Sequence, residues 1–77
     1  MREVKINCFY KHFKGMIVKV LLIAKDSEDL SEKVVYSHDN EIWVRDKNEF
    51  LSLVDKKKYP NIKQKYRFEE VKGDNDI

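Results

Sequence analysis

Residues 34–45 read VVYSHDNEIWVR, and this segment is the clearest structural unit in the chain. Two runs of β-branched and aromatic residues flank the polar sequence SHDNE, a pattern that is typical of a β-hairpin. A turn at Asp39-Asn40 gives each strand residue one partner across the hairpin. The pattern therefore predicts these cross-strand pairs: Val34 with Arg45, Val35 with Val44, Tyr36 with Trp43, and Ser37 with Ile42.

The predicted register divides the hairpin side chains between two faces. The first face carries three aliphatic residues that suit a hydrophobic core, namely Val35, Ile42 and Val44. The second face carries Tyr36 and Trp43 with Arg45 beside them, and we predict that it holds a binding site. A structural alternative stays open, because in a small domain both rings can close the core while Arg45 stacks over the indole as a cation–π lid.

The composition fits one small cytoplasmic domain. The 77 residues include 16 basic and 14 acidic side chains, and the net charge of +2 gives no long-range field of the kind that nucleic-acid-binding proteins display. Cys8 is the only cysteine, so an intramolecular disulfide cannot form and a reducing cytosol is expected. The first residues lack an apolar signal segment, and the longest apolar run, Val20–Ala24, is too short to span a membrane.

Residues 16–24, MIVKVLLIA, give the strongest prediction of a single strand. Val18, Val20, Leu22 and Ala24 alternate with the other side chains and form one continuous apolar face. A long strand of this kind often bends and serves two sheets of a small barrel. Just before it, Gly15 predicts a tight turn.

The rest of the chain adds up to three weaker strands, two loops and a helical turn. Residues 1–6 fit either a short edge strand or a frayed terminus, and residues 25–33 form an acidic, solvated loop. Asp46 can cap a helical turn that runs into a further strand. Residues 55–65 predict a basic loop, and residues 66–71 alternate again as a strand.

These segments together predict an all-β fold: a small SH3-like barrel of about five short antiparallel strands with one short helical turn. We expect a single domain over residues 1–72 and a flexible tail over residues 73–77.

Several short motifs, taken in order, resemble one known family. They are Tyr10-Lys11-His12-Phe13-Lys14-Gly15, Ala24 with Ser27-Glu28, Val35-Tyr36, Trp43-Val44-Arg45, Phe50, and Arg67-Phe68. Over about Tyr10–Val71 the series resembles the bacterial and phage family called domain of unknown function 1653. The resemblance implies an SH3-type barrel, and it implies no established activity.

Side chains suited to catalysis or metal binding are few. The soft metal ligands are Cys8, His12 and His38, and their spacing matches no zinc site. Cys8 and His12 lack a third catalytic member, and the two glycines cannot form a phosphate-binding loop. We therefore expect a non-enzymatic binding module without a metal or another cofactor, and either a monomer or a weak homo-oligomer.

The predicted partner is a protein, a peptide or a small polar ligand rather than a membrane. Tryptophan and arginine on one face favour protein contacts, in which both residue types are enriched. The side chains that we expect to contact the partner are Tyr10, His12, Tyr36, Trp43, Arg45 and Arg67.

Nucleic acid is the alternative partner. Residues 55–67 interleave lysines with tyrosines, a pattern in which bases stack on rings while phosphates pair with cations. The lysines of this hypothesis are Lys56, Lys57, Lys58, Lys63 and Lys65. A solvated basic loop explains the same pattern, and the nearly balanced net charge favours that explanation.

Overall fold

The central hairpin consists of β3 (Glu32–His38) and β4 (Glu41–Asp46) in the computed structural model, which describes residues 3–71. The predicted register is confirmed, because Val35 pairs with Val44 and Tyr36 with Trp43. Asp39 and Asn40 form the turn with φ values of 59° and 64°. Two successive left-handed residues make the tight hairpin turn whose twist matches that of the flanking strands.

The assignment of the two hairpin faces is wrong. Val34 and Tyr36 are buried, whereas Ile42 and Val44, which were expected in the core, are 63% and 61% exposed. Val35 is only half-buried. Apolar side chains stand on both faces, so the hairpin sequence alone cannot decide which face is covered by the rest of the chain.

Two phenylalanines from outside the hairpin decide that question. Phe50 lies in α1 (Lys47–Phe50) and Phe68 begins β5 (Phe68–Glu70). Their rings stack with centroids 4.1 Å apart, and each centroid lies 5.9 Å from that of Tyr36. The face that carries Tyr36 is therefore buried by aromatic packing that only the complete fold supplies.

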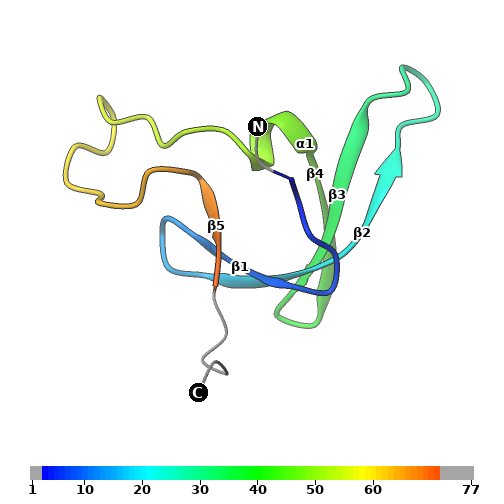
Figure 1. Ribbon diagram of the computed structural model, residues 1–77, viewed down its shortest axis with the longest axis horizontal. Coiled ribbons are helices and arrows are strands. Elements are labelled where there is room, and N and C mark those ends of the chain that lie inside the picture. Colours follow the sequence, from blue (N-terminus) through cyan, green and yellow to red (C-terminus); the bar gives the residue numbers. More distant parts are fainter. Residues whose placement is uncertain (1–2, 72–77) are drawn as a thin grey trace.

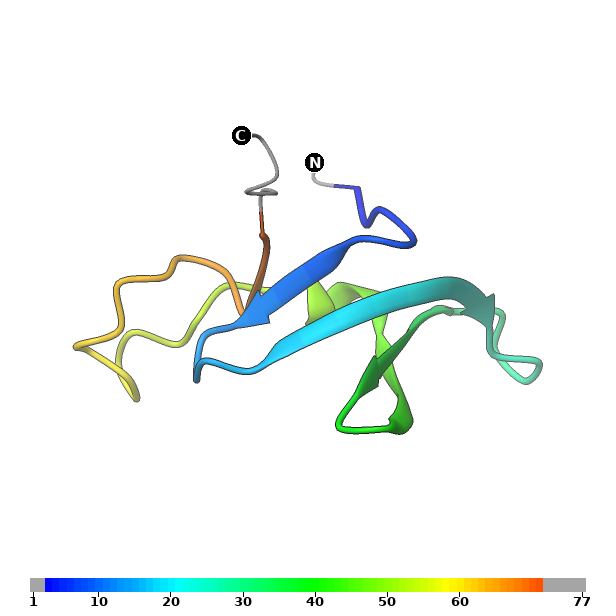
Figure 2. The ribbon, with the colours of Figure 1, turned by 90° about the horizontal axis from the view of Figure 1, so that it is seen from below.

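The five strands form one antiparallel sheet in the order β4-β3-β2-β1-β5 (Figure 1). β2 (Ile17–Lys25) is the longest strand and pairs with both β3 and β1 (Phe9–His12). Figure 2 shows that the β3–β4 turn projects away from the β1–β2 pair. The predicted all-β fold with one helical turn is confirmed, and the sheet is open, with β4 and β5 at its two ends.

A bulge interrupts the apolar face of β2. Val18 and Val20 are buried as predicted, but the register with β3 shifts between Val20 and Leu22. The extra residue reverses which side chains of the strand point inward. Leu22 is therefore 48% exposed, and Ile23 packs against the core. The predicted continuous apolar face of this strand is therefore wrong, and the strand belongs to one sheet rather than to two.

The Gly15 turn and the cap of the helical turn lie where the sequence predicts them. Gly15 joins β1 to β2 with φ 105°, and its N–H donates to the carbonyl of His12 at 2.7 Å. The Asp46 carboxylate accepts a hydrogen bond from the N–H of Asn48 at 2.9 Å and so caps α1. Beyond α1, the predicted strand is reduced to one β-bridge between Leu53 and Tyr66.

The ends of the chain differ from the prediction or lie outside the described residues. Residues 3–6 form no strand, because β1 already has β2 on one side and β5 on the other. The edge-strand alternative is therefore wrong for this part. The tail predicted for residues 73–77 lies outside the described residues. None of the helical structure in residues 3–71 has the length and hydrophobicity that a membrane span requires.

Candidate functional site

The candidate site begins with a small cavity of about 190 Å³, which we call the aromatic notch. Residues of all five strands contribute to its walls, including those of β4 and β5, which lie at opposite ends of the sheet order. The lining consists of the rings of His12, Tyr36, His38, Trp43 and Phe68, together with Met16, Val18 and Arg45. The lining is therefore largely apolar, with one guanidinium at its rim.

Trp43 forms the exposed wall of the aromatic notch. Its cross-strand partner Tyr36 is buried, but Trp43 itself is 46% exposed, so it does not close the core. The indole N–H donates to the carbonyl of His38 at 3.3 Å, which holds the ring against the end of the hairpin. The notch thus presents a fixed aromatic ring to solvent.

His12 is buried beside the notch. Its ring stacks on Phe13 with centroids 4.5 Å apart, and it meets the edge of Phe68 at 4.9 Å. The Nδ1 atom accepts a hydrogen bond from the backbone N–H of Lys14 at 3.1 Å. Burial, with the positive charges of Arg45, Arg67 and Lys14, lowers the pKa of His12 from 6.5 to about 4. His12 is therefore neutral at physiological pH.

Arg45 stands where the notch meets a second cavity. The structural alternative for this face placed the guanidinium over the indole, but the Cζ atom of Arg45 lies 5.6 Å from the ring centroid of Phe68. This ring comes from β5, which only the fold brings to the hairpin. Nη1 lies 3.7 Å from a carboxylate oxygen of the exposed Glu49. The buried Nε atom has no hydrogen-bond partner within residues 3–71.

The second cavity has a volume of about 430 Å³, and we call it the cationic basin. It shares His12, Met16 and Arg45 with the aromatic notch, so the two cavities adjoin. Four cationic side chains contribute to its lining, namely Lys14, Arg45, Lys58 and Arg67, with Asp55 as the one carboxylate. An apolar and a positively charged cavity therefore lie side by side, and we call the two together the cleft.

The structure brings together five of the six residues predicted to contact a partner. His12, Tyr36, Trp43 and Arg45 line the aromatic notch, and Arg67 lines the cationic basin. Tyr10 belongs instead to the core, where its ring meets the edge of Phe50 and its hydroxyl accepts a hydrogen bond from the N–H of Lys5.

The sequence reasoning missed several side chains of this cleft, among them Met16, His38, Phe68, Lys14 and Tyr59. Phe68 is the most important, since it touches His12, Tyr36 and Arg45. Its place depends on the pairing of β1 with β5, which joins residues more than fifty positions apart. The alternation of residues in this strand indicates that Phe68 points inward. It does not indicate which side chains the ring contacts there.

The lysine-rich loop between α1 and β5 extends to one side of the molecule (Figure 1). Lys56 donates to the backbone carbonyls of Ile62 and Gln64, so its ammonium group is used to hold the loop together. Lys65 lies over the ring of Tyr66 at 5.4 Å. Lys58 alone among the five predicted lysines lines the cationic basin. Nucleic-acid binding by this loop stays a prediction.

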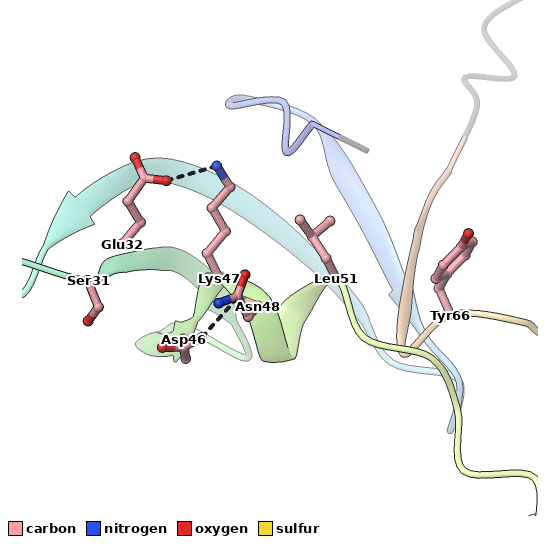
Figure 3. A pocket seen from close by; sticks show the side chains of 7 residues that line it. All are labelled: Ser31, Glu32, Asp46, Lys47, Asn48, Leu51 and Tyr66. Atoms are coloured by element: carbon pink, nitrogen blue, oxygen red, sulfur yellow. Dashed lines mark hydrogen bonds and ion pairs between the residues drawn. The ribbon is translucent and has the colours of Figure 1, made fainter. Parts of the chain in front are cut away.

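A third cavity, of about 560 Å³, lies beside α1 (Figure 3). Each of its three charged side chains forms an ion pair: Lys47 Nζ lies 2.9 Å from Glu32 Oε1, and Asp46 Oδ2 lies 3.7 Å from Nζ of Lys33, which is not part of the lining. Figure 3 shows the Glu32–Lys47 pair on one side of the cavity, with Leu51 and Tyr66 on the other. Within residues 3–71, no group of histidine, cysteine and acidic side chains is arranged to hold a metal ion.

The fold and the cleft define a class: a small domain built on one antiparallel sheet, with an aromatic and cationic cleft. A family model described as "Protein of unknown function (DUF1653)" matches residues 8–70, and the chain belongs to this family. The matched range contains all five strands and α1, and the resemblance seen in the sequence is confirmed. No curated protein and no solved structure matches the chain.

Proposed function

We propose that this domain is a non-enzymatic binding module of the SH3-like class, acting in the cytoplasm, which holds a protein or peptide partner in its aromatic and cationic cleft. The observation that carries the proposal is the exposed Trp43 ring, fixed by its hydrogen bond to His38 over an apolar cavity. Tryptophan and arginine side chains in such positions are the residues that dominate binding energy at protein interfaces.

The size of the aromatic notch supports a side chain as its occupant. Pockets for drug-sized ligands usually measure about 300–1,000 Å³, whereas the notch has about 190 Å³. One leucine or phenylalanine side chain suits a space of this kind. Burying such a side chain contributes about 1.5–3 kcal/mol, which is enough for an anchor residue in a weak complex.

The state of His12 favours binding over catalysis. The imidazole of His12 lines the notch, and a general base would need a pKa near the working pH. Here the pKa is lowered to about 4, and Nδ1 is occupied by the N–H of Lys14. His12 therefore supports the walls of the cleft and is poorly suited to proton transfer.

A library of random heptapeptides displayed on phage tests the proposal. Peptides selected on the wild-type domain are measured against Trp43→Ser and Val44→Ser, two variants on adjacent residues that point to opposite faces. We expect Trp43→Ser to weaken binding by at least about tenfold, equivalent to ~1.4 kcal/mol. Val44→Ser is expected to bind within about twofold of wild type, because its side chain lies outside the cleft.

Circular dichroism verifies that both variants are folded before affinities are compared. Selected peptides that bind folded Trp43→Ser as tightly as wild type would place the binding surface elsewhere. A library that yields no binder for the wild type would also contradict the proposal.

A further inference from the structure

We infer that the partner segment is acidic, with an apolar side chain in the aromatic notch and neighbouring carboxylates in the cationic basin. The inference rests on the proposed function and adds to it the chemistry of the partner. It depends on how the charges of the cleft are arranged.

The positive charge of the cationic basin is not neutralised within residues 3–71. Of its four cations, only Arg45 forms an ion pair there, and its partner Glu49 is exposed to solvent. The Nε atom of Arg67 donates to the hydroxyl of Ser52, which is uncharged. The acidic residue of the lining, Asp55, accepts hydrogen bonds from backbone N–H groups of its own turn. The basin therefore keeps a local excess of positive charge, although the whole chain is nearly neutral.

Aromatic rings hold two of these cations in place. Lys14 Nζ lies 5.5 Å from the ring centroid of Tyr59 and 5.9 Å from that of Phe13. Lys58 Nζ lies 5.7 Å from the same Tyr59 ring. A ring attracts a cation through its quadrupole but carries no opposite charge. The two ammonium groups are thus positioned at the wall of the basin while their charge stays available to an external anion.

His12 responds to the same positive field. Burial is the largest cause of its lowered pKa, and the charges of Arg45, Arg67 and Lys14 add to it. These three side chains come from different elements and converge on one ring. Their convergence agrees with the excess of positive charge that the lining of the basin shows.

The apolar notch favours a peptide over a nucleic acid as the source of that charge. Several polar groups around the notch already have partners inside the protein: the indole N–H of Trp43 binds a carbonyl, and Nδ1 of His38 lies 3.2 Å from the carbonyl of Ile17. A nucleobase in this space would lose hydrogen bonds to water without replacing them. An aliphatic or aromatic side chain has no such bonds to lose.

Titration of the ¹⁵N-labelled domain by NMR tests the inference with four probes. The first is the acetylated, amidated pentapeptide Asp-Asp-Leu-Asp-Asp, and the second replaces every aspartate by asparagine. The third replaces the leucine by serine, and the fourth is octathymidylate. We expect the first peptide to shift the indole N–H of Trp43 and the Nε–H of Arg67, and to bind at least about tenfold more tightly than the asparagine peptide at low salt.

Paired charge variants show whether the basin is the site of the effect. The double variant Lys14→Gln/Lys58→Gln removes two charges from the basin lining, and Lys57→Gln/Lys63→Gln removes two exposed charges outside it. We expect the first variant to weaken binding of the acidic peptide by about fivefold or more and to leave the asparagine peptide unchanged. The second should stay within about twofold of wild type.

The outcomes separate the inference from the proposed function. Equal binding of the aspartate and asparagine peptides would leave the notch as a binding site and overturn the acidic partner. Equal binding of the leucine and serine peptides would show that the notch is not used, and the proposed function would fail. Tighter binding of octathymidylate than of the acidic peptide, or no shift with any probe at millimolar concentration, would overturn the inference.

Discussion

On one face of the β3–β4 hairpin, Val34 and Tyr36 are buried, while Ile42 and Val44 on the other face lie largely in solvent. The four side chains are comparably apolar, and all stand in regular cross-strand pairs. The difference between the faces lies in what covers them. Phe50 and Phe68 reach the first face, and no described element lies over Ile42 and Val44. Burial in this small domain is thus decided by two rings that belong to other elements.

The uncovered face extends beyond the hairpin. Leu22, Val35 and Val44 are neighbours in register across β2, β3 and β4, so they form a short apolar row on the outer surface of the sheet. Single exposed apolar side chains are common on protein surfaces. A row of them at the β4 end of the sheet is less usual. Substitutions in this row and on the packed face should therefore differ in their effect on stability.

The largest expected effect comes from the covered face. Tyr36→Ala removes the ring that joins the hairpin to Phe50 and Phe68, and it leaves a cavity that the small core cannot refill. We expect the free energy of unfolding to fall by about 3–5 kcal/mol, measured by urea denaturation. Val44→Ala on the uncovered face is the control, and it should change stability by less than about 0.5 kcal/mol. Similar losses in the two variants would mean that both faces are packed.

A second prediction concerns His12, which lies on the covered side of the sheet. Its pKa is lowered to about 4 in the folded state, so between pH 6.5 and 4 the unfolded chain takes up a proton that the folded protein does not. Neutral His12 therefore makes its full contribution to the free energy of unfolding above pH 6.5, and this contribution is lost as the pH falls towards 4. We expect a loss of about 2 kcal/mol over this range.

The measurement is urea denaturation at several pH values, compared with the variant His12→Gln. This variant removes the titrating group, so its stability should fall less steeply with decreasing pH over the same range. An NMR titration of the His12 ring protons gives the pKa directly. A midpoint near 6.5 in the folded protein would contradict the described burial and the positive field around the ring.

Local features of the fold could be predicted from the sequence because their causes are local. The Asp39-Asn40 turn, the Gly15 turn and the cap at Asp46 each depend on a few adjacent residues. The register of the hairpin follows directly from its turn. Most of the candidate contact residues were found for the same reason, since Tyr36, Trp43 and Arg45 share a face once that register is fixed.

The choice of face could not be predicted, because it depends on long-range packing. Tyr36 was expected on the face opposite the core, but Phe50 and Phe68 bury most of its ring, and the rest lines the aromatic notch. Arg45 was expected over the indole and lies over Phe68 instead. The cationic basin has a similar origin, because Lys14 and Lys58 meet at Tyr59 only after the long loop has folded back. No sequence spacing indicates this contact.

The smallest expected effect is on the uncovered face. The double variant Ile42→Thr/Val44→Thr keeps β-branched side chains on β4, so it preserves strand propensity while it replaces apolar surface by hydroxyl groups. Both positions are exposed in the described structure, so the free energy of unfolding of the dilute protein should change by less than about 0.5 kcal/mol.

The same variant decides whether the apolar row is covered in solution. Sedimentation equilibrium and urea denaturation at several protein concentrations would be compared for wild type and variant. If the domain is a monomer, both proteins show stability that does not depend on concentration, because unfolding then involves no change in association. If two copies pack through this face, the wild type becomes more stable as its concentration rises and the variant does not. In that case Ile42 and Val44 would be buried by a second copy of the chain, and both faces of the hairpin would be covered in the assembled protein.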